Sequence, residues 1–201
     1  PYTAIPIGKN IGMIAVVSKS ETVSNINWKY GGSTLASAFS STSIKTYLCK
    51  HNPTKCDRER ALRNFALSCA GYCVFTYLFG VGDRHDDNIL CSKTGNMFHI
   101  DFGYFLGQRT KFLGFSRETC FFVLTQNYVC AMDGYFELFM DLSCQGFAIA
   151  QKYGPLFQTI LKLMIPSGSD IFCPEQIEYV ENIFQPGQSE SQQRSHFHHL
   201  I

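Results

Sequence analysis

The segments Gly82–Asn88 (GDRHDDN) and His99–Gly103 (HIDFG) decide how the chain folds around its centre. Between them, two short apolar runs at residues 88–91 and 97–100 flank the polar stretch 92–96, which contains a glycine. Short apolar runs on either side of a glycine-containing polar turn are typical of a tight β-hairpin. The sequence therefore predicts a hairpin that carries one of the two quoted segments at the open end of each strand.

Such a hairpin brings two oxygen donors, Asn88 and Asp101, to the same end of its strands. Divalent cations that bridge phosphate groups prefer carboxylate and amide oxygens. His85 and Asp83 precede the first strand on a loop, close enough to face a bound substrate and to manage charge at an attacking hydroxyl. Together these residues predict a metal-dependent phosphoryl-transfer site.

Outside this hairpin, a little β-structure leads into a mostly helical body. The apolar run Ile11–Val17 is predicted as a buried strand, with residues 22–26 as its hairpin partner. Residues 57–78 are predicted as a long central helix, because its second half is apolar on every face. Further helices are predicted at residues 34–39, 44–49, 135–152, 155–164 and 174–184, and the polar tail from residue 188 is expected to end in a helix. The predicted fold class is therefore α+β, in a single lobe.

Composition limits the classes of function. The chain has 201 residues, 45% of them apolar, which is enough for one domain with a sizeable core. Its 17 basic and 16 acidic residues nearly cancel, so no nucleic acid is expected as a partner and any anion site must be local. The nine cysteines are odd in number and lack CxxC spacing, which favours buried free thiols in a reducing cytosol over disulfides or zinc.

The uncharged stretch Asn64–Gly82 approaches the length of a membrane-spanning helix. It contains Ser68, Gly71 and Thr76, and it runs directly into the charged residues 83–85 without an aromatic belt or a basic flank. We therefore expect a buried core helix here and no transmembrane segment.

The two quoted segments together resemble the phosphatidylinositol 3- and 4-kinase family and its protein-kinase relatives. Residues 68–74 (SCAGYCV) are similar to the helix before the catalytic loop of phosphatidylinositol 3-kinases, and residues 122–126 (FVLTQ) are similar to the end of their activation loop. The resemblance covers nearly the whole chain. It implies a mostly helical C-terminal lobe of a protein-kinase-like fold over residues 1–201.

Within that lobe the resemblance implies a hinge at residues 11–17, a catalytic loop at 82–88, a metal-binding motif at 101–103 and an activation loop at 101–126. It also implies an N-terminal lobe and a C-terminal end that lie outside these residues. No glycine-rich phosphate loop followed by a lysine occurs in the sequence, so the 201 residues alone are expected to have little or no kinase activity.

Residue by residue, the resemblance implies a catalytic set and a metal-binding pair. His85 would assist deprotonation of the inositol hydroxyl or stabilise transition-state charge, Asp83 would orient it, and Arg84 would be mainly structural. Asn88 and Asp101 would bind Mg²⁺, with Mn²⁺ as an alternative, for the use of ATP.

The same resemblance implies a nucleotide pocket. Ile14, Ala15 and Val17 would form the hinge that contacts adenine, with the Val17 amide as a hydrogen-bond donor, and Leu90 and Ile100 would line the pocket floor. Many relatives carry an acidic residue at the position of Ala15, which need not matter because the hinge uses backbone groups. For the apolar members of this set, simple core packing is an equal alternative.

In this family the activation loop reads the lipid head group through basic side chains, here Arg109, Lys111 and Arg117. The loop is most similar to class I enzymes, although its basic clusters are thinner, so phosphatidylinositol 4,5-bisphosphate is the first expected substrate and less phosphorylated inositol lipids are the next. The alternative is a solvated loop whose charges only keep it soluble. The resemblance further implies a regulatory or adaptor subunit and a cytoplasmic enzyme recruited peripherally to membranes.

Two other classes of function stay open on the sequence. One is a protein Ser/Thr kinase of the related atypical family, against which the basic loop and the FVLTQ segment argue. The other is a non-catalytic pseudokinase scaffold, against which the intact His85, Asn88 and Asp101 argue.

Overall fold

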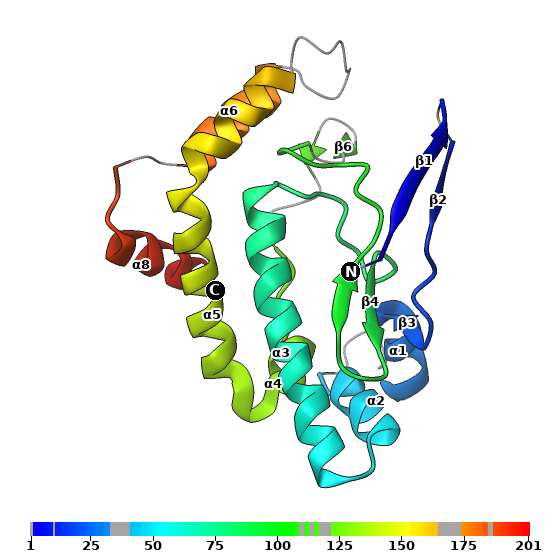
Figure 1. The fold of residues 1–201 in the computed structure, drawn as a ribbon. Helices are drawn as coiled ribbons and strands as arrows, with labels where there is room; N and C mark the ends of the chain where they lie inside the picture. Colours follow the sequence, from blue (N-terminus) through cyan, green and yellow to red (C-terminus); the bar gives the residue numbers. More distant parts are fainter. Residues whose placement is uncertain are drawn as a thin grey trace.

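A computed structural model describes residues 2–9, 11–32, 41–108, 111–112, 115–116, 122–164, 174–184 and 187–201. The long helix α3 (Lys55–Leu78) runs through the middle of the molecule, with α5 (Phe136–Lys152) along one side and the central sheet on the other (Figure 1). Helices dominate, and the strands form three small antiparallel sheets. The α+β class predicted from the sequence is confirmed.

The remaining elements follow in chain order. The strands are β1 (Ala4–Gly8), β2 (Ile11–Ile14), β3 (Ser20–Thr22), β4 (Ile89–Ser92), β5 (Met97–His99), β6 (Lys111–Phe112) and β7 (Phe115–Ser116). The helices are α1 (Val23–Tyr30), α2 (Ser43–His51), α4 (Gln126–Met132), the 3-10 turn η2 (Asp133–Tyr135), α6 (Gly154–Met164), α7 (Pro174–Ile183) and α8 (Glu190–Leu200).

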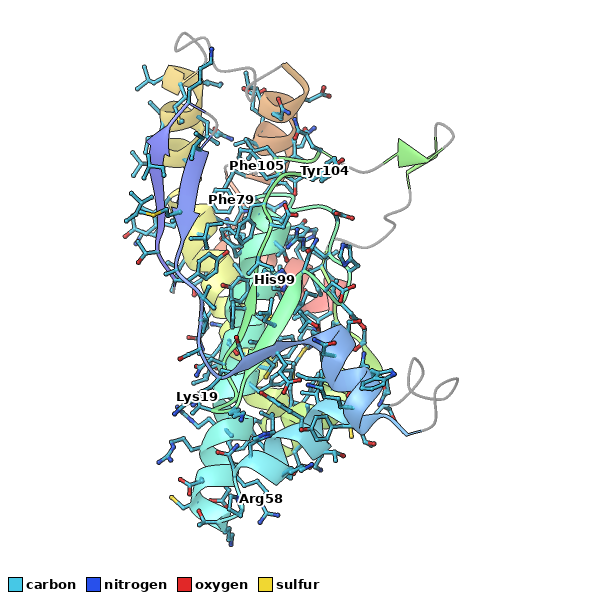
Figure 2. All side chains as sticks on the ribbon, turned by 90° about the vertical axis from the view of Figure 1, so that its right-hand side faces the viewer. Lys19, Arg58, Phe79, His99, Tyr104 and Phe105 are labelled. Atoms are coloured by element: carbon cyan, nitrogen blue, oxygen red, sulfur yellow. The ribbon has the colours of Figure 1, made fainter. Side chains whose placement is uncertain are left out.

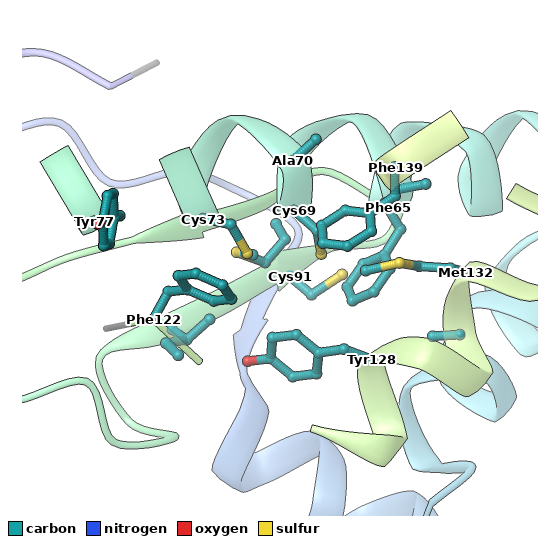
Figure 3. Packing of buried hydrophobic residues seen from close by; sticks show 14 of the residues in the cluster. Phe65, Cys69, Ala70, Cys73, Tyr77, Cys91, Phe122, Tyr128, Met132 and Phe139 are labelled. Atoms are coloured by element: carbon teal, nitrogen blue, oxygen red, sulfur yellow. The ribbon is translucent and has the colours of Figure 1, made fainter. Parts of the chain in front are cut away.

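Helix α3 begins at a side-chain cap and carries much of the core. The Thr54 hydroxyl accepts a hydrogen bond from the Asp57 amide (3.1 Å), which satisfies one of the first free amides of the helix. Phe65, Cys69 and Cys73 lie on its buried face. In Figure 3 these side chains pack beside Cys91 and the ring of Tyr128. Burial raises the pKa of the Cys73 thiol to about 12, so this thiol stays protonated and packs as an apolar side chain of the core.

The central sheet has the strand order β3-β4-β5, and it holds the hairpin predicted from the sequence. Ile89 faces His99 and Leu90 faces Phe98 across the two strands. The hairpin is attached to α3 by the Met97 amide, which donates to the Ser68 hydroxyl (2.9 Å). The turn end of the hairpin is therefore held in place by the central helix.

Gly95 lets the hairpin turn approach the backbone of α3. Its φ is +89°, and a Cβ atom added there would lie 1.9 Å from the Ala61 carbonyl oxygen. We expect Gly95→Ala to lower the free energy of unfolding by about 2–4 kcal/mol, because left-handed backbone costs about 1–2 kcal/mol and overpacking about 1–3 kcal/mol. Urea unfolding of wild type and variant measures this difference.

The matched control for that variant is Gly187→Ala. Gly187 has a φ of +97° with nothing within 4 Å of an added Cβ, so it carries only the backbone cost, about 1–2 kcal/mol. Equal losses of unfolding free energy in the two variants would show that the close approach of Gly95 to α3 contributes nothing to stability.

The start of the chain differs from the sequence prediction. Ile11–Ile14 does form a strand, but it pairs with the preceding β1, and its side chains are exposed, Ile14 by 67%. The prediction of a buried strand is wrong because β1 and β2 form a separate two-stranded sheet with both faces exposed. Residues 22–26 are not its partner: after β3 they enter α1, where Val23 and Ile26 are buried at helical spacing behind the Thr22 cap.

Other sequence predictions are confirmed where the structure describes them. The helices predicted at 44–49, 57–78, 135–152, 155–164 and 174–184 correspond to α2, α3, α5, α6 and α7, and the polar tail ends in α8. The helix predicted at 34–39 lies outside the described residues. All seven described cysteines are free, although Cys56 is exposed. Among the described helices, none combines the length and apolarity needed to cross a bilayer.

Candidate active site

The backbone pairing of the hairpin strands puts Asn88 and Asp101 at neighbouring positions at its open end. The Ile100 amide donates to the Asn88 carbonyl oxygen (3.0 Å), so Asp101 follows directly after the residue that faces Asn88. The Asn88 side chain is nearly buried, and its Nδ2 donates to the Asp83 carbonyl oxygen (2.9 Å). That bond fixes the orientation of the amide and leaves its Oδ1 as an oxygen donor.

Arg84 fastens the loop 82–88 to the segment that contains Asp101. Its Nε donates to the Gly82 carbonyl oxygen (2.7 Å), and one terminal nitrogen donates to the Ile100 carbonyl oxygen (2.7 Å). The other terminal nitrogen donates to the Asp101 carbonyl oxygen. A single planar guanidinium thus spans both halves of the site, a geometry that a lysine could not reproduce.

Both aspartates of the site adopt left-handed backbone. Asp83 has a φ of +58° and Asp101 a φ of +56°. Aspartate tolerates this region better than most residues, and strained backbone of this kind is concentrated at functional sites. The Asp101 Oδ1 also accepts a hydrogen bond from the Gly103 amide (3.2 Å), which holds its carboxylate while it stays exposed.

His85 projects into solvent between two carboxylates. Its side chain is 54% exposed, with Nε2 3.8 Å from Asp83 Oδ2 and Nδ1 3.8 Å from Asp87 Oδ2. The Asp87 amide donates to Nδ1 (3.3 Å), so the neutral ring carries its proton on Nε2. The imidazole is therefore available to a substrate rather than packed in the core.

His99, the first residue of the second segment, is a different kind of histidine. It is buried and stacks flat on Tyr72, with ring centroids 4.7 Å apart and an interplanar angle of 8°. Desolvation, with a smaller contribution from Arg84, lowers the pKa of His99 to about 3, so its ring is neutral. Figure 2 shows it beside the strands, next to the core. Its contribution is to packing behind the site.

A polar network, which sequence reasoning did not find, anchors the loop 82–88 at Asp86. The Asn27 Nδ2 donates to Asp86 Oδ2 (2.9 Å), and Asn27 in turn accepts hydrogen bonds from Ser43 and from Asn127 Nδ2 (2.9 Å). The Ser24 amide donates to the Asp86 carbonyl oxygen (3.1 Å). The loop between His85 and Asn88 is thereby tied to α1, α2 and α4.

Burial is the main reason that the pKa of Asp86 lies above its ordinary value; the Asn27 hydrogen bond opposes it, and Asp87 adds to it. The folded protein therefore takes up a proton at Asp86 more readily than the unfolded chain, so ionised Asp86 costs stability at neutral pH. We expect Asp86→Asn to raise the free energy of unfolding at pH 7 by at most about 1 kcal/mol, because the residue is only partly buried. The gain should shrink as the pH falls toward the folded-state pKa, as urea unfolding at pH 7 and pH 4.5 would measure.

Asp87→Asn is the control for this variant, because Asp87 is exposed in the same loop. Its effect on unfolding should stay within about 0.5 kcal/mol at both pH values. A gain for Asp86→Asn that grows at the lower pH would contradict the assignment of a desolvated carboxylate.

The five residues predicted to bind nucleotide lie on two parts of the fold. Ile14 ends β2 and Ala15 follows it, both exposed, while Val17 is half-buried between β2 and β3. Leu90, in β4, and Ile100, just after β5, are half-buried, and Leu90 faces Thr22 of β3. Before β3 the chain turns at residues 17–20, where the Ser20 hydroxyl donates to the Val17 carbonyl oxygen (2.7 Å). Within the described residues, Ile14 and Ala15 do not pack in the core.

The predicted head-group residues fall where the structure describes little. Arg109 and Arg117 lie outside the described residues, and of Lys111 only the backbone is described, in the short strand β6. The end of the segment predicted as the activation loop is described from Phe122, which is buried and packs against Phe197 of α8 at a centroid distance of 5.8 Å.

The donor atoms at the hairpin fit a hard divalent cation. One amide oxygen from Asn88 and one carboxylate from Asp101 are the oxygen ligands that Mg²⁺ prefers, with the other positions left to water and phosphate. In the part of the chain that the structure describes, no cluster of three or more His, Cys, Asp or Glu side chains offers an all-protein metal site.

Comparisons with known proteins point to one family. The family model for phosphatidylinositol 3- and 4-kinases matches residues 1–169. The chain is 38% identical over its whole length to phosphatidylinositol 3-kinase 1 of Dictyostelium discoideum, of which it covers 13%. It is 37% identical to the phosphatidylinositol 4-phosphate 3-kinase C2 domain-containing subunit alpha of Pongo abelii, over all of the chain and 12% of that relative. Over 98% of the chain, it is 36% identical to the phosphatidylinositol 3-kinase C2 domain-containing subunit gamma of Homo sapiens, of which it covers 14%.

The chain belongs to the phosphatidylinositol 3- and 4-kinase family. It spans about an eighth of the length of these curated relatives. Relatives whose names give different head-group substrates match the chain almost equally well. Sequence identity alone therefore does not identify which phosphoinositide is the substrate.

Proposed function

We propose that the chain is the C-terminal lobe of a phosphatidylinositol 3-kinase, which transfers the γ-phosphate of ATP to the 3-hydroxyl of a phosphoinositide. The observation that supports this best is the Arg84 bridge, which holds the loop of Asp83 and His85 against the backbone of Ile100 and Asp101. Family membership and relatives named phosphatidylinositol 3-kinases support the reaction class.

In this proposal each residue of the site has one role. Asn88 and Asp101 hold Mg²⁺, or Mn²⁺, which neutralises phosphate charge when bound with ATP. His85 lies beside the inositol hydroxyl; since its Nδ1 already accepts the Asp87 amide, its Nε2 proton is placed to stabilise charge on the transferred phosphate. Asp83 orients that ring, and Arg84 maintains the geometry.

The nucleotide and lipid sites are proposed on the same basis. Ile14, Ala15 and Val17 present hinge backbone and apolar surface to adenine, with Leu90 and Ile100 beneath it. Arg109, Lys111 and Arg117 pair with head-group phosphates, which favours phosphatidylinositol 4,5-bisphosphate; the name of one relative supports the 4-phosphate instead. The full-length protein is proposed to bind a regulatory subunit and to be recruited peripherally to membranes. The isolated 201 residues are proposed to be inactive, because no glycine-rich phosphate loop followed by a lysine lies among them.

The test is a kinase assay of the full-length protein on vesicles that contain phosphatidylinositol, its 4-phosphate or its 4,5-bisphosphate. We expect 3-phosphorylated products, formed fastest from the bisphosphate. Equal rates on all three lipids would contradict selection by the loop. Phosphorylation of protein but not lipid would support an atypical protein kinase, and failure to bind Mg-ATP would support a scaffold.

A further inference from the structure

The segments on either side of the active site pair with each other through their backbones. The Gly82 amide donates to the Tyr104 carbonyl oxygen (2.9 Å), and the Leu106 amide donates to the Phe79 carbonyl oxygen (2.6 Å). A third bond joins the Gly107 amide to the Gly80 carbonyl oxygen (3.1 Å). The residues that lead into the catalytic loop are thus paired with those that follow the Asp101 motif. Figure 2 labels Phe79, Tyr104 and Phe105 close together at this point.

One aromatic ring from α7 lies against both glycines of this pairing. A Cβ atom added to Gly80 would come within 2.6 Å of Tyr179 Cζ, and one added to Gly107 would come within 2.6 Å of Tyr179 Cδ2. Both glycines have positive φ, +49° and +79°. The ring therefore packs directly on main-chain atoms that only glycine leaves uncovered.

The Tyr179 hydroxyl extends the same contact to a third segment. It donates a hydrogen bond to the carbonyl oxygen of Tyr77, near the C-terminal end of α3. The same carbonyl oxygen also accepts the Gly80 amide (3.3 Å), where the chain leaves the helix. A single side chain thus contacts the end of α3, the entry to the catalytic loop and the segment after the Asp101 motif.

From these contacts we infer that Tyr179 is a positioning residue, which fixes the start of the activation loop against the catalytic loop. The inference rests on the proposed kinase function. Its described contacts lie at Gly80, Gly107 and the Tyr77 carbonyl oxygen, so Tyr179 acts through the Gly80–Gly107 pairing on the loop that carries Arg109 and Lys111. Its loss should therefore impair the use of lipid more than the binding of ATP.

The test compares Tyr179→Leu, which removes the flat ring, with Tyr179→Phe, which removes only the hydroxyl, in the full-length protein. We expect Tyr179→Leu to raise the KM for lipid about 10-fold, since small displacements of a positioned substrate are costly, while the KM for ATP stays within about twofold. Tyr179→Phe should stay within about threefold of wild type in both. A purely structural role would lower the active fraction and kcat without changing the KM for lipid, and that result would overturn the inference.

Phe184→Leu is the matched control. Phe184 is a buried ring just beyond the same helix, but it packs on Gly154 and Phe157 instead of the Gly80–Gly107 pair. An equal shift in the KM for lipid in this variant would also overturn the inference.

A second measurement does not depend on activity. Hydrogen exchange at the Leu106 and Gly107 amides should be about 10-fold faster in Tyr179→Leu than in wild type, and unchanged in Phe184→Leu. If wild type phosphorylates no lipid, the proposed function fails and hydrogen exchange still decides the positioning contact. Unchanged exchange in Tyr179→Leu would refute that contact.

Discussion

Asp101→Asn is expected to lower kcat/KM for lipid phosphorylation by the full-length protein about 10³-fold, because a bound metal supplies several kcal/mol of charge stabilisation and needs its carboxylate ligand. Asparagine keeps an oxygen that can accept the Gly103 amide, as Asp101 Oδ1 does at 3.2 Å. It also leaves the Asp101 carbonyl oxygen for Arg84. The substitution therefore removes charge with little change to the fold.

The control for this variant is Asp87→Asn. Asp87 is an exposed carboxylate of the neighbouring loop 82–88, 3.8 Å from His85 Nδ1, and is assigned no metal. It should change kcat/KM by no more than about threefold. If both variants lost activity equally, the total negative charge around the site, and not a specific ligand at Asp101, would explain the loss.

His85→Gln is expected to lower kcat about 10²–10⁴-fold, the range typical of a positioned acid–base or charge-stabilising side chain, with the KM for ATP nearly unchanged. The prediction follows from position: the ring is 54% exposed and lies beside Asp83, so its loss removes chemistry without opening a cavity in the core. Steady-state kinetics with varied ATP separates the two parameters.

Two comparisons make the His85 result specific. His198→Gln, an exposed histidine of α8, should leave kcat unchanged. Thermal unfolding should show the same stability for His85→Gln as for wild type. Full activity in His85→Gln would remove this residue from the site and leave Asn88 and Asp101 as its only chemical groups.

The hairpin and the central helix could be predicted because their signals are local. Residues 92–96 form a turn whose glycine must have positive φ, and the apolar runs on either side have the length of strands. Likewise, α3 combines a threonine cap with an apolar face that repeats at helical spacing.

The predictions for residues 11–17 were wrong where burial depends on contacts that a local sequence pattern does not contain. Ile11–Ile14 has the apolar content of a buried strand, but its exposure depends on what covers β1 and β2, which a local pattern does not reveal. The start of α1 could have been found, since Val23, Ile26 and Tyr30 repeat at helical spacing after the capping Thr22. In α8, only tertiary packing explains why the single ring of Phe197 is buried.

The residues of the candidate site also differ in whether local sequence could reveal them. His85, Asn88 and Asp101 are recognisable from residue type and spacing, whereas the Asp86 network joins positions as distant as Asn27 and Asn127. Single asparagines at such positions carry no periodic or motif signal. Tyr179 is similarly inconspicuous, because its role depends on two glycines that lie far from it in the chain.

The proposed kinase site requires a cation shared between Asn88 and Asp101. The direct measurement is Mn²⁺ binding to the ATP complex of the full-length protein, followed by electron paramagnetic resonance, for Asn88→Leu, Asp101→Asn and the double variant. We predict weaker Mn²⁺ binding in each single variant and a double variant little worse than Asp101→Asn, the non-additivity expected of two ligands on one ion. Wild-type Mn²⁺ affinity in Asn88→Leu, or losses that simply add, would contradict a shared ion.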